Sequence, residues 1–350
     1  MQDQFRNCKV FLPFNFVPQY LLRAFFEFNS YFLVSNLQKS RYLTITHNDL
    51  YFTRTPTELE IFMSDVTVVG LGAMGTTIAR LFINQGLRVT LWNRSRDKAE
   101  TFIKQGAKVA ATITEALEAS PVTIMCVFDY AAATTILQQL HSSASLRQRT
   151  LIQMTTGSPE DARKSLAWAS AHEMNYLDAA IQAAPSQMGQ ENTPVLLSGD
   201  EKVFLETKPL LKLLAGNIIY LGGKIDAAAT VDAATLSYVY GAMTGFTHGA
   251  RMVEVAGLDV AQFGKIVNEI SPSFGEFFQH EGNVIQSGDF TISESPLRIS
   301  VIATERILQS SADANINTEI PAFIADLFKR ADAAGLGDKE AAALIEVIRD

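Results

Sequence analysis

Two groups of residues in this sequence have types and spacings that suit chemistry. In the segment "GLGAMG", Gly70, Gly72 and Gly75 have the G-x-G-x-x-G spacing, which is typical of a turn that binds a dinucleotide pyrophosphate. The second group is a lone carboxylate, Asp232, near the start of the apolar stretch "AATVDAATLSYVYGAM" (228–243). Asp232 is either an anion stabilised by the dipole of a helix start or a group that faces a cleft and handles a proton.

The predicted strands and helix around Gly70, Gly72 and Gly75 indicate that these glycines form a dinucleotide-binding turn. The β-branched stretch "DVTVVG" precedes them, "GAMGTTIARLFINQG" has helical spacing, and "LRVTLWNRS" follows as a second strand. In such a βαβ unit the glycines allow a tight turn, a close approach of the backbone to phosphate, and packing of the helix on the sheet. We therefore expect the cofactor to contact Gly70, Leu71, Gly72, Ala73, Met74 and Gly75.

The end of the second strand indicates which dinucleotide is bound. An enzyme that uses NAD carries an acid about 20 residues after the glycines, where it binds the ribose 2'-hydroxyl. This sequence has Asn93, Arg94 and Ser95 at that place, with Lys98 following. Because a guanidinium matches the oxygens of a phosphate, the turn predicts NADPH as the cofactor. A solvated charged turn is the alternative.

Strands and helices alternate from Asp65 onward. Helices are expected at 96–105, at 113–119 and over "PEDARKSLAWASAH", and strands at "AKVA", 122–128, "TLIQMTT", "NYLDAAI" and "NIIYLGG". This alternation predicts an α/β Rossmann domain over 63–225, with a parallel sheet covered by helices on both faces. Residues 226–350 read as an all-α domain joined by a long interdomain helix, with breaks at "SPSFGEF" and "TISESPL".

Residues 1–62 differ from the rest of the chain. They are rich in aromatic side chains and show no steady helix or strand period. Prolines and charged residues such as Pro13, Pro18, Arg23 and Glu27 interrupt the apolar run that a signal peptide or membrane span would need. We expect an atypical extension outside a catalytic fold that begins at Met63; a genuine interaction segment is the alternative.

Composition excludes several classes of function. The 350 residues include 47% apolar ones, enough for a core in each domain. A net charge of -8, without any basic run, argues against binding to nucleic acid or to an anionic membrane. Cys8 and Cys126 are far apart and no His or Cys has metal-ligand spacing, so we expect neither disulfides nor a metal site. A reducing cytoplasm fits best.

Several motifs together resemble one family. They are "VTVVGLGAMG", "LWNRSRDKA", "CVFDYAA", "QMTTGSPEDAR", "YLDAAIQAAPSQMG", "LLSGD" and "GLGDKEAAALIEVIR". Their order and spacing resemble those of NADPH-dependent imine reductases and reductive aminases, which are similar to the larger β-hydroxyacid dehydrogenase group that includes 3-hydroxyisobutyrate dehydrogenase. The resemblance runs from about Met63 to the C-terminus. It implies a Rossmann domain and a helical domain that intertwines with that of a second subunit, giving a homodimer.

The chain departs from the hydroxyacid enzymes at the connecting helix. Those enzymes carry a catalytic lysine there, in a pattern like K-x-x-N-N, whereas this sequence has "VDAATL", with Asp232 in place of the lysine and Thr235 and Leu236 in place of the asparagines. The "DAPVSGG"-like substrate loop is likewise changed, to "DAAIQAAPSQMG". Both changes favour an imine reductase, in which an aspartate at this position is commonly the proposed proton donor.

The resemblance also implies the remaining site residues. Tyr240 shares a helix face with Asp232 and would orient the substrate by a hydrogen bond; a core aromatic is the alternative. Thr156 stands where some reductive aminases have an asparagine, and with Thr155 it would lie beside the nicotinamide. His248 is a weaker candidate for an acid or base, because it lies further along the helix. The expected substrate pocket contains Pro185, Ser186, Met188, Leu236 and Met243; a purely architectural proline turn is the alternative for the first three.

Three functions remain open from the sequence. The first is an NADPH-dependent oxidoreductase that reduces an imine or iminium, formed from a carbonyl and an amine, with Asp232 as proton donor or iminium-stabilising carboxylate. The second is a β-hydroxyacid dehydrogenase-like enzyme acting on an alcohol or carbonyl, against which the missing lysine argues. The third is a non-catalytic NADP-binding sensor, which would tolerate loss of Asp232.

Overall fold

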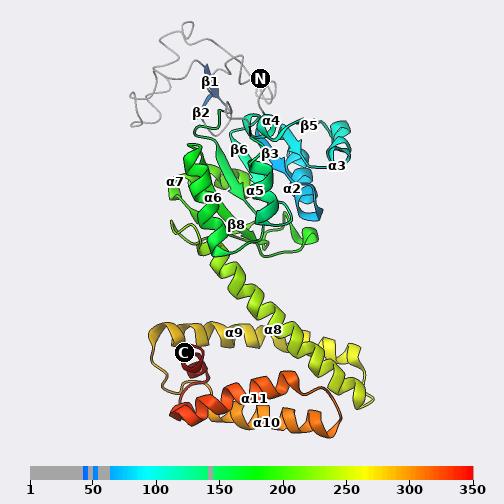
Figure 1. Ribbon diagram of the computed structural model, residues 1–350, viewed down its shortest axis with the longest axis vertical. Helices are drawn as coiled ribbons and strands as arrows, with labels where there is room; N and C mark the ends of the chain where they lie inside the picture. The colour runs from blue at the N-terminus through cyan, green and yellow to red at the C-terminus, as the bar shows by residue number, and fades with distance from the viewer. Residues whose placement is uncertain (1–41, 46–49, 54–63, 141–144, 350) are drawn as a thin grey trace, which may run out of the picture. The chain divides into compact units, whose positions relative to one another are not determined.

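The computed structural model describes residues 42–45, 50–53, 64–140 and 145–349 (Figure 1). The chain divides into two compact units, Met1–Asp232 and Ala233–Asp350. The division falls within helix α8 (Ala227–Val255), a few residues later than the predicted start of the helical domain. Most of the predicted extension over 1–62 lies outside the described residues. Within it, β1 (Tyr42–Ile45) and β2 (Leu50–Thr53) form an antiparallel pair.

An eight-stranded sheet forms the centre of the first unit. Its strands are β3 (Val66–Val69), β4 (Val89–Trp92), β5 (Lys108–Val109), β6 (Val122–Met125), β7 (Thr150–Gln153), β8 (Asn175–Ile181), β9 (Pro194–Gly199) and β10 (Asn217–Tyr220). The strand order is β10-β9-β8-β7-β6-β3-β4-β5. The sheet confirms the predicted Rossmann architecture.

One pair of strands departs from the predicted parallel sheet. β8 and β9 are antiparallel, whereas every other neighbouring pair of this sheet is parallel. A parallel neighbour needs a crossover that returns the chain to the opposite edge, usually through a helix. Between β8 and β9 the structure has only the short 3-10 helix η5 (Pro185–Gln187), so the chain turns back at the edge where β8 ends.

Helices of the first unit surround this sheet in Figure 1. They are α2 (Ala73–Asn84), α3 (Arg96–Glu100), α4 (Ile113–Glu118), α5 (Tyr130–Leu137), α6 (Pro159–Ala171) and α7 (Glu201–Leu211). Side-chain oxygens cap the last four at their first residues, as Thr, Asp and Ser do at helix starts. The helix predicted over 96–105 is shorter than expected, because α3 gives way to the 3-10 helix η4 (Ile103–Gln105) and a left-handed Gly106.

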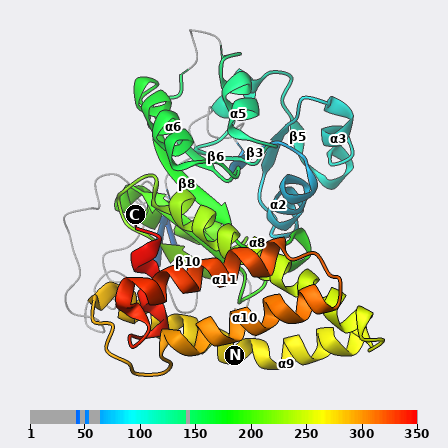
Figure 2. The ribbon, with the colours of Figure 1, turned by 60° about the horizontal axis from the view of Figure 1, so that its bottom comes forward.

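The second unit is helical, as predicted. After α8 it contains α9 (Val260–Ser287), α10 (Leu297–Asp313), α11 (Glu319–Ala331), the short π-helical turn η6 (Asp332–Leu336) and the 3-10 helix η7 (Ala341–Val347). α10 and α11 lie side by side in both views (Figure 1 and Figure 2). None of the helices in the described part of the chain has the length and apolar character that a membrane span requires.

One of the two predicted breaks in the helical domain is wrong. The segment "TISESPL" does interrupt the helices, but "SPSFGEF" lies inside a continuous α9 that includes Pro272. A proline removes the hydrogen bond to the carbonyl four residues before it. Here that carbonyl belongs to the exposed Asn268 and can be hydrated, while the Ser271 hydroxyl donates to the Val267 carbonyl at 2.6 Å.

Candidate active site

The glycine turn lies where the order of the sheet reverses. β3 pairs with both β4 and β6, so the turn after β3 occupies the topological switch point, outside the carboxyl ends of the strands, where open α/β sheets bind ligands. Gly70 has φ +96°, and a Cβ there would lie 2.2 Å from the Cys126 carbonyl oxygen. A Cβ on Gly75 would lie 2.0 Å from the Gly70 carbonyl oxygen. Both positions therefore require glycine to close the turn.

Gly72 has a different reason to be glycine. It stands at the N-cap position of α2, where glycine has no side chain that could accept a hydrogen bond from the first amides of the helix. A Cβ placed on it would meet nothing within 4 Å. The first amides of a helix lack partners within the helix and carry the positive end of its dipole. Open space beside uncapped amides fits a pyrophosphate, so the residues present fit a dinucleotide.

The turn after β4 divides into a structural and an exposed part. The side chain of Asn93 accepts a hydrogen bond from the Leu71 N–H at 2.9 Å and donates to the Ser95 carbonyl at 2.9 Å. This predicted cofactor ligand therefore braces the glycine turn. Arg94 and Lys98 are exposed, and neither side chain has an ion pair with another described residue. Their charges are available to a phosphate.

The two threonines after β7 have different environments. Thr155 is buried, and its hydroxyl accepts a hydrogen bond from the Val127 N–H at 3.0 Å. It therefore holds the loop after β6 beside the glycine turn. Thr156 is exposed, as its predicted position beside the nicotinamide requires. The loop after β6 also presents Phe128, whose side chain is 93% exposed and which sequence reasoning did not select.

The predicted substrate loop lies after the carboxyl end of β8. Pro185 is partly buried and Ser186 is exposed in η5. Met188 is only 7% exposed and packs in the main apolar cluster of the first unit, with residues such as Phe82 and Leu197. Core packing therefore explains Met188 within this unit, whereas the serine is free to face a ligand.

Helix α8 begins against the strands β8 and β9. The Ala228 N–H donates to the Ser198 hydroxyl at 3.1 Å, and one turn later the side-chain amide of Gln182 donates to Oδ1 of Asp232 at 2.5 Å. Gln182 follows β8 directly, so Asp232 reaches the carboxyl edge of the sheet, the edge that carries the glycine turn.

Asp232 is buried, with 5% of its surface exposed. Burial raises the pKa of its carboxyl group, and the hydrogen bond from Gln182 acts in the opposite direction with a smaller effect. A carboxyl group with a raised pKa can hold a proton closer to neutral pH than an ordinary aspartate. The structure thus gives Asp232 the environment expected of a proton-handling group.

A second buried carboxylate lies near Asp232, and sequence reasoning missed it. Asp178 in β8 is 2% exposed and accepts hydrogen bonds from the hydroxyls of Tyr130 and Tyr176. Burial raises the pKa of Asp178 to about 7, against the effect of the tyrosine hydrogen bonds and with a contribution from the charge of Asp232. The alternation of a strand gave a usable signal, because Tyr176, Asp178 and Gln182 share one face of "NYLDAAIQ".

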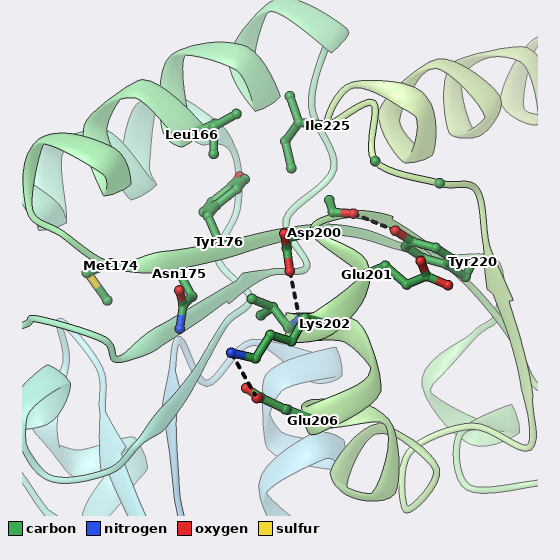
Figure 3. Close-up of a pocket in the computed structure, with 14 residues that line it drawn as sticks. Leu166, Met174, Asn175, Tyr176, Asp200, Glu201, Lys202, Glu206, Tyr220 and Ile225 are labelled. Atoms are coloured by element: carbon green, nitrogen blue, oxygen red, sulfur yellow. Dashed lines mark hydrogen bonds and ion pairs between the residues drawn. The ribbon is translucent and has the colours of Figure 1, made fainter.

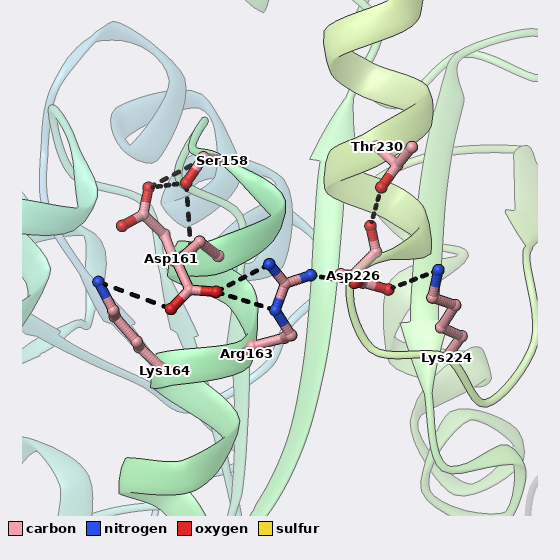
Figure 4. Close-up of polar contacts among 8 residues, drawn as sticks. Ser158, Asp161, Arg163, Lys164, Lys224, Asp226 and Thr230 are labelled. Atoms are coloured by element: carbon pink, nitrogen blue, oxygen red, sulfur yellow. Dashed lines mark hydrogen bonds and ion pairs between the residues drawn. The ribbon is translucent and has the colours of Figure 1, made fainter.

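An ion-pair cluster fixes the start of α8 to α6 (Figure 4). Arg163 pairs with Asp226, and the Lys224 ammonium lies 3.6 Å from the other oxygen of this carboxylate. Burial alone would raise the pKa of Asp226, but the hydrogen bond and charge of Arg163 and the charge of Lys224 hold it below its usual value. The cluster thereby anchors the residue that directly precedes the helix carrying Asp232.

A groove of about 780 Å³ lies at the other edge of the sheet (Figure 3). It is lined by residues including Asn175 at the start of β8 and Tyr220 at the end of β10. β9 is antiparallel to β8, and Gly199 at its end pairs with Leu177. The groove therefore lies at the amino edge of the parallel strands, away from the glycine turn and Asp232.

Further predicted site residues belong to the second unit. Tyr240 and Met243 on α8 are each 58% exposed, and Leu236 is partly buried. Nϵ2 of His248 lies 3.2 Å from the Ser311 hydroxyl on α10, so a contact within the helical unit accounts for it. Among the described residues, no group of His, Cys, Asp or Glu could hold a metal ion.

Comparisons with known proteins match both parts of the chain. Residues 65–222 match the NAD binding domain of 6-phosphogluconate dehydrogenase, and residues 225–350 match the C-terminal domain of NADPH-dependent reductive aminase-like proteins. An NADPH-dependent reductive aminase of Aspergillus oryzae is 28% identical over 289 residues, which are 81% of this chain and 97% of that protein.

Solved structures agree with these matches. A reductive aminase from Aspergillus terreus in complex with NADPH and ethyl levulinate is 31% identical with a TM-score of 0.76, covering 82% of this chain and 99% of that one. An imine reductase from Myxococcus stipitatus in complex with NADP+ is 26% identical with a TM-score of 0.74, covering 81% and 99%. These likenesses confirm the predicted fold and an NADP-dependent oxidoreductase. The chain belongs to the family of NADPH-dependent imine reductases and reductive aminases.

Proposed function

We propose that this protein reduces the C=N bond of an imine or iminium to an amine, with Asp232 as the proton donor or as the carboxylate that stabilises the iminium. The observation that carries the proposal is the position of Asp232. A buried carboxyl group lies at the same edge of the sheet as the glycine turn. There it would be near the reacting end of a dinucleotide bound across the switch point.

The charge of the side chain supports an imine over an alcohol or carbonyl as the substrate. A lysine at this position would stabilise a developing alkoxide, as the resemblance to hydroxyacid dehydrogenases implies, whereas Asp232 cannot. A carboxylate attracts an iminium, and a protonated carboxyl group can donate to a neutral imine nitrogen. The dehydrogenase alternative is disfavoured for this reason. A sensor would not need a buried carboxyl group at the carboxyl edge.

Each group of the chain then has a defined task. NADPH, when bound, supplies the hydride that adds to the imine carbon. The amides after Gly72 bind its pyrophosphate, and Arg94 binds its 2'-phosphate. The Gln182 amide fixes the orientation of the Asp232 carboxyl group through their hydrogen bond.

The remaining pocket residues are part of the proposal. Tyr240 orients the substrate by a hydrogen bond, and Pro185, Ser186, Leu236 and Met243 line the pocket. Thr156 offers a hydroxyl where some reductive aminases have an amide, which is a weaker partner for an amine. We therefore propose that the protein reduces imines already formed more efficiently than it couples a ketone with an amine.

We also propose that the working protein is a homodimer. The second unit exposes large apolar side chains that a monomer would leave in water: Tyr238, Phe246, Phe274, Phe278, Ile299, Ile302 and Phe323. Exposed apolar surface of this kind marks a protein contact, and a second copy of this chain is the partner that the family supports. Light scattering should report twice the mass of one chain. A cytoplasmic location stays a prediction that follows from the few cysteines.

Substrate class is tested by following NADPH consumption with a small cyclic imine such as a pyrroline, and NADP+ reduction with hydroxyisobutyrate. The proposal predicts turnover of the imine alone. Turnover of the hydroxyacid without the imine would favour the dehydrogenase alternative. Firm NADPH binding without turnover of either substrate would favour a sensor.

A further inference from the structure

The loop after β6 lies directly against the glycine turn. A Cβ on Gly70 would lie 2.2 Å from the Cys126 carbonyl oxygen and 2.8 Å from Cγ1 of Val127. β6 neighbours β3 on the side away from β4. If Arg94 after β4 holds the adenosine end of a dinucleotide that lies across the switch point, the nicotinamide half extends over the end of β6. The next residue of the loop on that side is Phe128.

The ring of Phe128 lies in water. The side chain is 93% exposed, and no other large apolar side chain among the described residues is exposed to this extent. Covering a ring of this size is worth about 1.5 to 3 kcal/mol. Such exposure would mean little on a loop without fixed contacts, so the contacts of the flanking residues matter.

The residues on both sides of Phe128 are fixed by hydrogen bonds. Before it, the Val127 N–H donates to the buried Thr155 hydroxyl at 3.0 Å. After it, the Asp129 carboxylate accepts a hydrogen bond from the Ala132 N–H at 2.7 Å and caps α5. The backbone on either side of the exposed ring is therefore held to the rest of the first unit.

Tyr130 adds a third fixed point to this loop. It is buried, and its hydroxyl donates a hydrogen bond to the Asp178 carboxylate of β8. Its ring packs so closely on Gly157 that a Cβ there would lie 2.2 Å from the ring. These contacts oppose any rearrangement that would fold the Phe128 ring into the core. The loop thus holds an apolar ring in water at the place where a ligand would cover it.

We propose that Phe128 is a cofactor-binding residue whose ring packs against the nicotinamide half of bound NADPH. The inference rests on the part of the proposed function that places the pyrophosphate at the amides after Gly72 and the 2'-phosphate at Arg94. It does not depend on the substrate being an imine. The ring supplies apolar contact area on the side of the switch point opposite to Arg94, where the charged turn after β4 supplies none.

The test compares two ligands that differ in the nicotinamide half. Calorimetry of the full chain gives the Kd for NADPH and for adenosine 2',5'-bisphosphate, which keeps the adenosine and the 2'-phosphate but has no nicotinamide nucleoside. Phe128→Ala should raise the Kd for NADPH by about ten- to a hundredfold, the loss expected when a covered aromatic ring is removed. The Kd for the bisphosphate should stay at its natural value. Arg94→Ala should instead weaken the binding of both ligands.

Two further variants serve as controls. Phe128→Tyr keeps the ring and should bind NADPH as the natural chain does. Leu205→Ala removes an apolar side chain that is 55% exposed on α7, away from the glycine turn, and should change neither Kd. Because Phe128 is exposed, Phe128→Ala should leave the Tm of the ligand-free chain unchanged, but NADPH should raise that Tm by less than it raises the Tm of the natural chain.

The binding measurements keep this inference separate from the proposed function. If the natural chain does not reduce the imine but Phe128→Ala still weakens NADPH binding alone, the inference stands and the proposed function fails. An unchanged Kd for NADPH in Phe128→Ala would overturn the inference, even if KM for the imine rose, because the ring would then contact the substrate. Equal weakening of NADPH and the bisphosphate would overturn it too, because the ring would then act on the half that both ligands share.

Discussion

The side-chain amide of Gln182 donates a hydrogen bond to Oδ1 of Asp232, and this contact joins the carboxyl end of β8 to the first turns of α8. The donor favours the ionised carboxyl group, while burial favours the protonated one. The balance between these two effects decides the pH range over which Asp232 can give a proton. The contact therefore links the fold to the pH dependence of the reaction.

Gln182→Met should move the alkaline limb of kcat to higher pH. This substitution keeps the length of the side chain and removes the donor, so the pKa of Asp232 should rise further above its ordinary value. Loss of orientation should also lower kcat by about tenfold, since a hydrogen bond to a charged group contributes about 1.5 to 3 kcal/mol. The matched control is Gln139→Met. Gln139 is exposed just after the end of α5, so this substitution should change neither kcat nor the pH of its alkaline limb. If the alkaline limb of kcat stays at the same pH in Gln182→Met, then Gln182 does not influence the pKa of Asp232.

Arg94→Ala should raise KM for NADPH by about ten- to a hundredfold, while KM for NADH changes little. The exposed guanidinium would lose a charge-assisted contact with the 2'-phosphate, a group that NADH lacks. Arg96→Ala is the control, because Arg96 is paired with Glu100 at 3.0 Å. Equal effects of Arg94→Ala on both cofactors would contradict the assignment.

Gly72→Ala should weaken NADPH binding by at least about tenfold and lower stability by less than about 1 kcal/mol. The added Cβ meets no protein atom, and alanine is only a poorer N-cap than glycine, but it would project where a phosphate approaches. Gly70→Ala should instead lower stability by about 1 to 3 kcal/mol, because its Cβ would overlap the Cys126 carbonyl. Calorimetry of the two variants with and without NADPH distinguishes the two effects.

Glu281→Gln should stabilise the helical unit near neutral pH. Burial, together with the charge of Glu340, raises the pKa of Glu281 above 4.5, so the folded state binds this proton more tightly than the unfolded state. Ionisation of Glu281 therefore costs stability as the pH rises, and removing its charge avoids that cost. The gain in Tm should disappear below the ordinary glutamate value of 4.5. Glu276→Gln, exposed on the same helix, should show no such dependence.

Local patterns predicted the parts of the site that depend on backbone geometry. The spacing of Gly70, Gly72 and Gly75 predicts the turn because the left-handed Gly70 and the close approach of Gly75 to its carbonyl lie within one short segment. Asn93 braces the glycine turn in the structure, because its partner, the Leu71 N–H, lies in the turn after another strand; its contact with the cofactor stays a prediction. Asp178 was missed, since its hydrogen-bond partner Tyr130 lies 48 residues earlier in the sequence and only the folded chain brings the two together.

In the fold, too, local sequence patterns predicted the elements, whereas features that depend on distant contacts or on exposure were not predicted. Alternating strands and helices predicted the Rossmann sheet, but the reversed direction of β9 depends on pairing along its whole length with β8. Pro272 predicted a break that α9 does not have. The penalty for an internal proline depends on whether the freed carbonyl can be hydrated, and that depends on exposure, which the sequence does not state.

The most direct test of the role of Asp232 is the rate of NADPH consumption with a pyrroline by Asp232→Asn. Asparagine keeps the shape and can still accept the hydrogen bond from Gln182, but it has no carboxyl proton to give and no charge to hold an iminium. We expect kcat to fall by about 100- to 10,000-fold, while the Kd for NADPH and Tm stay close to those of the natural chain. An unchanged kcat would contradict this expectation.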